Sequence, residues 1–257
     1  MPSRYPALFI SHGAPDFILT EQAAVTALRQ LGERYPQPRA IVVVSAHWIR
    51  RPIGVTAGEA HGTIHDFSGF AEALYQLTYP AKGDPGLAAN IADQLSAHGI
   101  ESELIPDRGL DHGAWIPLLL SHPQARVPVI QVSLPSADLP ECAGLGEALG
   151  PLRDEEVLII GSGGSVHNLR AMNREERTDA WASGFEQWLR ETVEGNRFEE
   201  LLSAEQSSPL FPAAHPTSEH FAPLLTAWAA GDRHRPGRRF HHSYSYGNLG
   251  MSMFEFG

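Results

Sequence analysis

The sequence has one cysteine, no membrane-length apolar run and no excess of positive charge. The single cysteine, Cys142, excludes an intramolecular disulfide framework and a thiolate-rich zinc site. No stretch approaches the roughly 20 uninterrupted apolar residues that span a bilayer, and the N-terminus lacks the pattern of an export signal. The formal net charge of −11 argues against nonspecific binding to nucleic-acid phosphates. These absences predict a cytoplasmic protein that binds neither nucleic acid nor membrane.

The pattern of the chain predicts one α/β domain over residues 1–257. A hydrophobic content of 42% in 257 residues is enough for a substantial core. Strand-like and helix-like segments alternate, and no low-complexity linker or internal repeat divides them. Such alternation is typical of a mostly parallel central sheet flanked by helices, with right-handed crossovers between the parallel strands.

Apolar runs and helical periodicity give the expected elements. Strands are expected at residues 7–12, 41–47, 101–105, 127–134 and 156–161, with one or two more within 240–256. Helices are expected at residues 20–35, 67–77, 85–98, 115–120, 142–153, 174–194 and 219–230. Three of these strands lead into histidines.

Two of the apolar strands end in a small residue followed by a histidine, at His12 and His47. A third strand leads through a glycine-rich turn to His167. We expect the first two strands to be neighbours, and open α/β sheets bind ligands at the carboxyl ends of their strands. Imidazoles gathered at one such edge predict a metal site. Histidine ligands without thiolates suit zinc, iron or another first-row metal rather than magnesium or calcium.

Two more histidines are candidates for the same crevice. His112 lies in a loop that enters a helix, and His220 opens an apolar helix. Other histidines lie in loops or polar contexts and are expected to be exposed: His61, His65, His98, His122, His234, His241 and His242. Of these, His65 and His242 are the two that could reach a pocket.

Motifs for other chemistries are weak or missing. Residues 161–165, Gly-Ser-Gly-Gly-Ser, could cradle a phosphate, but they lack both the Gly-x-Gly-x-x-Gly pattern and the Walker lysine. No Gly-x-Ser-x-Gly nucleophile elbow occurs. Serines 11, 45 and 162 stand near strand ends, where a hydroxyl most simply serves as a hydrogen-bonding partner of a neighbouring ligand.

Nine stretches carry a resemblance to a known family. In order along the chain they are residues 9–13, 45–48, 64–70, 74–75, 79–81, 109–115, 161–170, 219–221 and 247–253. The sequences Ser-Ala-His-Trp at 45–48, Gly-Leu-Asp-His-Gly-Ala-Trp at 109–115 and Glu-His-Phe at 219–221 are among the most distinctive. The chain resembles the class III extradiol ring-cleavage dioxygenases, most closely the DOPA 4,5-dioxygenase-like branch, over nearly its whole length.

The resemblance implies roles for five histidines. His12, His47 and His220 would bind the metal, with Glu219 standing beside the third position, which a glutamate fills in related branches. His167 would be the acid and base, and it would approach closely enough to act as a fourth ligand when zinc occupies the site. His112 would line the pocket and hydrogen-bond to dioxygen or to the substrate.

The resemblance also implies a cofactor and a reaction. Fe(II) would be needed for activity, and Zn(II) would be able to occupy the same site. A DOPA-like or otherwise substituted catechol would be opened by O₂ to a muconic semialdehyde. Aromatic residues expected to form the pocket wall are Trp48, His65, Phe67, Phe70 and Tyr75, and Arg170 and Lys82 are candidates to face an anionic substituent.

Two other functions remain open at this point. A zinc hydrolase would use the same histidines to hold a metal that activates water, with His167 as a proton shuttle. A non-catalytic metal-binding or scaffold protein would keep the fold without the reaction. The sequence does not decide the identity of the catechol, the position of ring cleavage or the oligomeric state.

Overall fold

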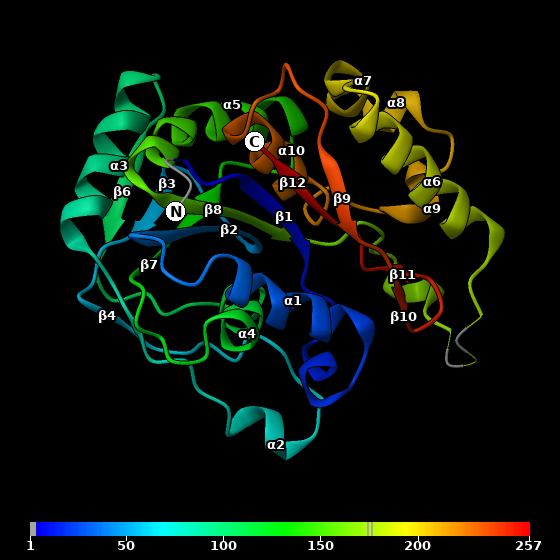
Figure 1. Ribbon diagram of the computed structural model, residues 1–257, viewed down its shortest axis with the longest axis horizontal. Helices are drawn as coiled ribbons and strands as arrows, with labels where there is room; N and C mark the ends of the chain where they lie inside the picture. The colour runs from blue at the N-terminus through cyan, green and yellow to red at the C-terminus, as the bar shows by residue number, and fades with distance from the viewer. Residues whose placement is uncertain (1–3, 174, 176) are drawn as a thin grey trace.

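The computed structural model describes residues 4–173, 175 and 177–257. Within them a central sheet runs through the molecule, with helices on both of its faces (Figure 1). Its eight strands lie in the order β6 (Ser102–Ile105), β3 (Ile53–Thr56), β7 (Val129–Leu134), β2 (Ala40–Ile49), β8 (Val157–Gly163), β1 (Ala7–Ser11), β12 (Met253–Phe256) and β9 (Arg238–His241). Two small two-stranded sheets pair β4 (Ala60–His61) with β5 (Ala81–Lys82), and β10 (Tyr244–Ser245) with β11 (Leu249–Gly250).

The middle of the sheet is parallel, as the sequence predicts. Strands β7, β2, β8 and β1 all run in one direction, with Ile41 opposite Val129 and Val42 opposite Ile159. Antiparallel pairing begins outside this group, where β12 joins β1 and β3 joins β7. The expected fold class, an α/β domain with a mostly parallel sheet, is confirmed.

The α-helices of the described residues differ widely in length, from 4 to 15 residues. They are α1 (Ala23–Arg34), α2 (Glu72–Tyr75), α3 (Pro85–Ala97), α4 (His112–Ser121), α5 (Leu139–Leu149), α6 (Ala180–Glu194), α7 (Phe198–Leu202), α8 (Ala204–Ser207), α9 (Phe211–Ala214) and α10 (Ala222–Ala230). Three short 3₁₀ turns add η1 (Pro15–Leu19), η2 (Gly150–Glu155) and η3 (Leu169–Ala171).

Alternate residues of the strands belong to two hydrophobic clusters, one on each face of the sheet. On one face Ile41 and Val43 pack with side chains of α1 and α4. On the other face Val42 and Val44 pack with side chains of α3, α5 and α10. Because successive side chains of a strand point to opposite faces, the continuous apolar run of β2 serves both clusters.

Several boundaries differ from the sequence prediction. The helix expected at 67–77 is limited to the four residues of α2, since Gly69 has a φ of +81° that a right-handed helix does not allow. The helix expected from 174 begins at Ala180, and residue 174 itself lies outside the described residues. The strand expected to end at His47 continues to Ile49 through a register shift against β7. Strand β3 was not expected.

One topological expectation is wrong. The strands that precede His12 and His47 are not neighbours, because β8 lies between β1 and β2 and pairs with both. Ser162 on β8 therefore stands between the two histidine-bearing strands.

Over the described residues, none of the helices has the length and apolar character needed to cross a membrane.

Candidate metal centre

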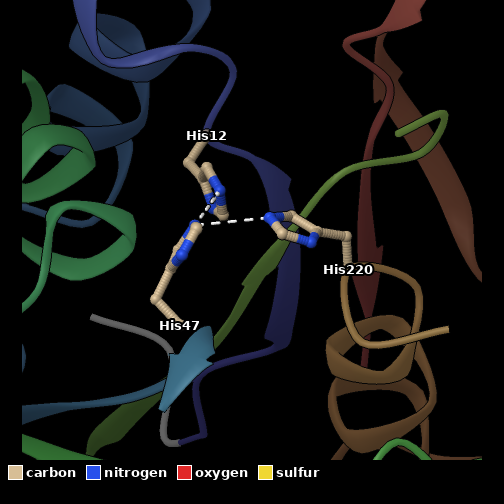
Figure 2. Close-up of side chains that lie close together, drawn as sticks. All are labelled: His12, His47 and His220. Carbon is tan, nitrogen blue, oxygen red and sulfur yellow. Dashed lines mark hydrogen bonds between the residues drawn. The ribbon is translucent and has the colours of Figure 1, made fainter. Parts of the chain in front are cut away.

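Three imidazoles meet at the carboxyl end of the central strands (Figure 2). His12 follows β1 directly, His47 lies near the end of β2, and His220 lies in the turn before α10. The Nε2 atom of His47 is 3.0 Å from Nε2 of His12 and 3.3 Å from Nε2 of His220. One ligand atom from each residue lies within 4.8 Å of the others. The structure thus brings together the three histidines predicted as metal ligands.

Glycines on β8 allow His220 to reach this point. A Cβ atom at Gly163 would lie 2.1 Å from the carbonyl oxygen of His220, and one at Gly161 would lie 2.1 Å from that of Pro223. The same His220 carbonyl accepts a hydrogen bond from the amide of Gly164 at 2.9 Å. The glycine-rich segment at the end of β8 therefore allows close packing of the turn that carries His220.

Hydrogen bonds fix the tautomers of two of the rings. The hydroxyl of Ser162 donates to the carbonyl of Gly113 at 2.5 Å, so its oxygen accepts from Nδ1 of His12 at 3.0 Å. The carboxylate of Glu219 accepts from Nδ1 of His220 at 3.0 Å. With each proton on Nδ1, the Nε2 atoms of both rings carry lone pairs, and both point toward His47.

The spacing and charge state of the three rings fit a metal ion. Bonds of about 2.0–2.1 Å to adjacent nitrogen ligands require nitrogen atoms about 2.9–3.4 Å apart, depending on coordination geometry. The observed 3.0 and 3.3 Å lie in that range. Burial lowers the pKa of His47 to about 3 and lowers the pKa values of His12 and His220 well below 6.5. Neutral imidazoles are the form that binds metals.

A carboxylate orients the fourth histidine, His112, at the first turn of α4. The Oδ1 atom of Asp66 accepts from the backbone amide of His112 at 2.9 Å and from its Nδ1 atom at 3.0 Å. Burial raises the pKa of Asp66, but the hydrogen bonds from His112 outweigh it and lower the pKa to about 2. The His112 ring is held 3.9 Å, centroid to centroid, from the ring of His47.

His167 approaches the cluster from the side of His220. The two rings stack in parallel, with centroids 3.4 Å apart and an interplanar angle of 5°. Two hydrogen bonds anchor the loop that carries His167. Its backbone amide donates to the carbonyl of Ala214 at 2.9 Å, and the side-chain amide of Asn168 donates to the carbonyl of Ala213 at 2.7 Å. Burial lowers the pKa of His167, so its ring is neutral near pH 7.

These five histidines open onto one cavity of about 630 Å³. Phe67 and Phe70, two of the aromatic residues predicted for the pocket wall, line it. The other three are not among the described residues that line it: Trp48 stacks against Arg108, His65 hydrogen-bonds to the carbonyl of Leu77, and Tyr75 packs against Phe67. Arg170 and Lys82 are exposed and are not among the described residues that line the cavity.

The sequence analysis gave no role to several residues that the structure places here. Asp66 lies within a quoted motif, but no local pattern indicated that it would reach His112. Asp16 and Tyr246 line the cavity, as do the apolar side chains of Leu169, Met172 and Met251. Leu169 and Met251 lie within stretches that carry the family resemblance, whereas Asp16, Met172 and Tyr246 lie outside them.

Two histidines expected to be exposed are buried, and that expectation is wrong. His61 is 3% exposed on β4, and His122 is 7% exposed at the end of α4. The ring of His122 hydrogen-bonds to the carbonyl of Tyr35 at 2.9 Å and to the Ser121 hydroxyl at 3.0 Å. His215, which the sequence analysis left out, is also buried and hydrogen-bonds to the carbonyl of Ser165.

Comparisons with known proteins find relatives over nearly the whole chain. The family model for the catalytic LigB subunit of aromatic ring-opening dioxygenase matches residues 7–256. A 4,5-DOPA dioxygenase extradiol from Beta vulgaris is 37% identical, over 96% of this chain and 95% of its own length. One from Escherichia coli is 36% identical, over 91% of this chain and 88% of its own. The crystal structure of an uncharacterized Escherichia coli K12 protein is 31% identical, with a TM-score of 0.82 over 99% of this chain and 100% of the other.

The fold and the histidine cluster define an α/β protein with a candidate metal centre at the carboxyl edge of its sheet. The chain belongs to the LigB family of aromatic ring-opening dioxygenases. The resemblance to the DOPA-dioxygenase-like branch of the class III extradiol enzymes is thereby confirmed, and the protein is a ring-cleaving dioxygenase with a metal cofactor. The hydrolase and scaffold alternatives receive no support from these relatives.

Proposed function

We propose that this enzyme opens the ring of a substituted catechol with O₂ to give a muconic semialdehyde, using Fe(II) bound by His12, His47 and His220. The observation that carries the proposal is the trio of Nε2 atoms at metal-ligand spacing beside a neutral His167. The names of the Beta vulgaris and Escherichia coli relatives support a substrate class, a catechol of the DOPA type.

Three imidazole ligands leave open positions at which Fe(II), when bound, supplies binding and activation of both a catecholate and O₂. The residues of the chain do the rest. His167 takes the proton of a catechol hydroxyl on a ring nitrogen and returns a proton later in the reaction. His112, held by Asp66, offers Nε2 as a hydrogen-bonding partner for the substrate.

The cavity wall positions the ring and limits access of water. Phe67 and Phe70 stand at right angles to each other, with ring centroids 5.5 Å apart, and provide aromatic surface for a planar substrate. Behind them His65 and Tyr75 pack against Phe67, at centroid distances of 5.7 and 5.3 Å. These contacts hold the wall in place without themselves reaching the substrate.

The test is product formation by protein purified without oxygen and loaded with Fe(II). Addition of O₂ and a panel of catechols is expected to give a yellow ring-opened product, identified by its spectrum and mass. The zinc-loaded protein is expected to bind one metal per chain and to be inactive. Absence of a ring-opened product from every catechol of a broad panel would overturn the proposal.

A further inference from the structure

The active-site cavity carries one formal charge on its described lining, and that charge is negative. Asp16 is the carboxylate among the described residues that line the cavity, and no lysine or arginine is among them. The remaining side chains of the lining are histidines, aromatic residues, Tyr246 and apolar groups. A substrate substituent that enters this space therefore meets an acidic group and no described basic one.

Only one of the two oxygens of the Asp16 carboxylate has a hydrogen-bond partner among the described residues. Its Oδ2 atom accepts a hydrogen bond from the hydroxyl of Tyr246, whereas its Oδ1 atom is buried and has no hydrogen-bond partner among the described residues. The backbone carbonyl of Tyr246 is held by the amides of Asn173 and Asn248, both at 2.8 Å. A buried carboxylate oxygen without a partner is costly, and a bound cation removes the cost.

Asp16 is near enough to the metal ligands to contact a substituent of a bound ring. It stands four positions after His12, so at about 3.3–3.6 Å per residue the two Cα atoms are at most about 14 Å apart. Gly13, with a φ of +65°, turns the chain between them, and the 3₁₀ turn η1 begins at Pro15. Asp16 therefore lines the same cavity as the metal ligands, at a distance that a side chain of a bound catechol can span.

We infer that the preferred substrate is a catechol whose side chain ends in a protonated amine, and that the carboxylate of Asp16, a residue of the cavity lining, pairs with that ammonium group. This inference rests on the proposed catechol cleavage. An added carboxylate, as in an amino acid, finds no described cationic partner in the cavity. An aminoalkyl catechol is therefore preferred over a catechol amino acid, and both over a catechol with only a carboxylate. The overall charge of −11 also favours a cationic substrate.

The experiment compares four catechols that differ in the charge of the side chain: dopamine, DOPA, 4-ethylcatechol and 3,4-dihydroxyphenylpropionate. Turnover by the Fe(II) enzyme gives kcat/KM, and calorimetry without oxygen gives Kd in the absence of reaction. We expect dopamine to exceed 4-ethylcatechol by about 10- to 100-fold in both measures, the range of a charged hydrogen bond. The propionate is expected to be the poorest of the four.

Two variants and a matched control assign this preference to Asp16. Asp16→Asn is expected to reduce the dopamine to 4-ethylcatechol ratio to near one. Tyr246→Phe keeps the carboxylate and is expected to keep the ratio above ten. Asp93→Asn removes the same charge from an exposed position on α3, outside the cavity lining, and is expected to leave the ratio unchanged.

The outcomes separate this inference from the proposed function. If no catechol is cleaved, the proposed function has failed. If catechols are cleaved but the ratio for the unmodified enzyme is near one, or the propionate is preferred, the recognition of an amine is overturned. The same conclusion follows if folded, metal-loaded Asp16→Asn keeps the preference for dopamine.

Discussion

The two ends of the central parallel strands each carry a cavity, and the larger one lacks the histidine cluster. At the amino end, residues 36–39 and 119–128 line a cavity of about 930 Å³ next to the first residues of β2 and β7. It contains one histidine, His122. At the carboxyl end the cavity is about 630 Å³ and contains five histidines. Cavity size alone would select the wrong end.

The difference lies in where the ring nitrogens point. His122 is about as buried as His12 and His220, and burial lowers its pKa as it does theirs, so neither property distinguishes the two ends. Both nitrogens of His122 have protein partners. At the carboxyl end, His12 and His220 use Nδ1 for protein partners and leave Nε2 facing another imidazole. Convergent lone pairs, rather than burial or volume, mark the site.

The largest expected effect comes from removing a candidate ligand. His12→Ala is expected to reduce bound metal to well below one per chain. Ring cleavage should fall by about 10³-fold or more, since metal catalysis supplies several kcal/mol. The matched control is His122→Gln at the opposite end, which should keep full metal content and activity. Elemental analysis and product formation measure both. Equal loss of metal in the two variants would remove the distinction between the ends.

The next largest effect concerns His167. Replacement by Gln is expected to lower kcat by about 10²-fold or more, because general acid and base catalysis is lost, while one metal remains bound. Substrate binding without oxygen should change little. Unchanged kcat in His167→Gln would contradict the assigned proton transfer, and loss of the metal would instead make His167 a ligand.

A third prediction tests the close packing that positions His220. Gly163→Ala would place a Cβ atom 2.1 Å from the carbonyl oxygen of His220, so the turn must shift. We expect a loss of about 1–3 kcal/mol in the free energy of unfolding and weaker metal binding by about 10-fold. Gly144→Ala on α5, with no atom within 4 Å of the added Cβ, should be neutral or stabilising. Thermal unfolding of both variants, with and without zinc, measures the loss of stability and of metal binding. Equal stability and equal stabilisation by zinc in the two variants would show that close packing at Gly163 is not needed to position His220.

The features that could be predicted from the sequence are those that follow from patterns of neighbouring residues. Apolar runs that end in His12 and His47 place these residues at strand ends whatever the rest of the chain does. The parallel sheet follows from the alternation of strands and helices. His220 depends on the resemblance, because in sequence it is simply a polar residue before an apolar helix.

The remaining features depend on contacts between distant segments. Nothing in the sequence around Ser162 indicates that β8 separates β1 from β2, since strand order is decided by packing of the whole chain. Asp66 reaches His112 across 46 positions, and Tyr246 reaches Asp16 across 230. His122 looked exposed because its partner, the carbonyl of Tyr35, lies 87 positions away. Contacts between residues so far apart produce no local pattern in the sequence from which they could be predicted.

The smallest expected effect is the pH dependence contributed by His122 at the amino end. Burial keeps its ring neutral in the folded protein and its pKa below 6.5. Below pH 6.5 the unfolded chain gains a proton that the folded chain does not, so stability falls as the pH falls. One such group changes the free energy of unfolding by at most about 1.4 kcal/mol per pH unit.

The variant His122→Gln tests this contribution, because the amide can still donate to the carbonyl of Tyr35 but does not titrate. The histidines of the candidate metal centre are present in both proteins, so their acid titration cancels in the comparison. Denaturant unfolding at pH 7 and pH 5 should therefore show a smaller loss of stability in the variant than in the unmodified protein. Identical losses would mean that the acid sensitivity of the fold resides at the carboxyl end, with the histidines that converge there.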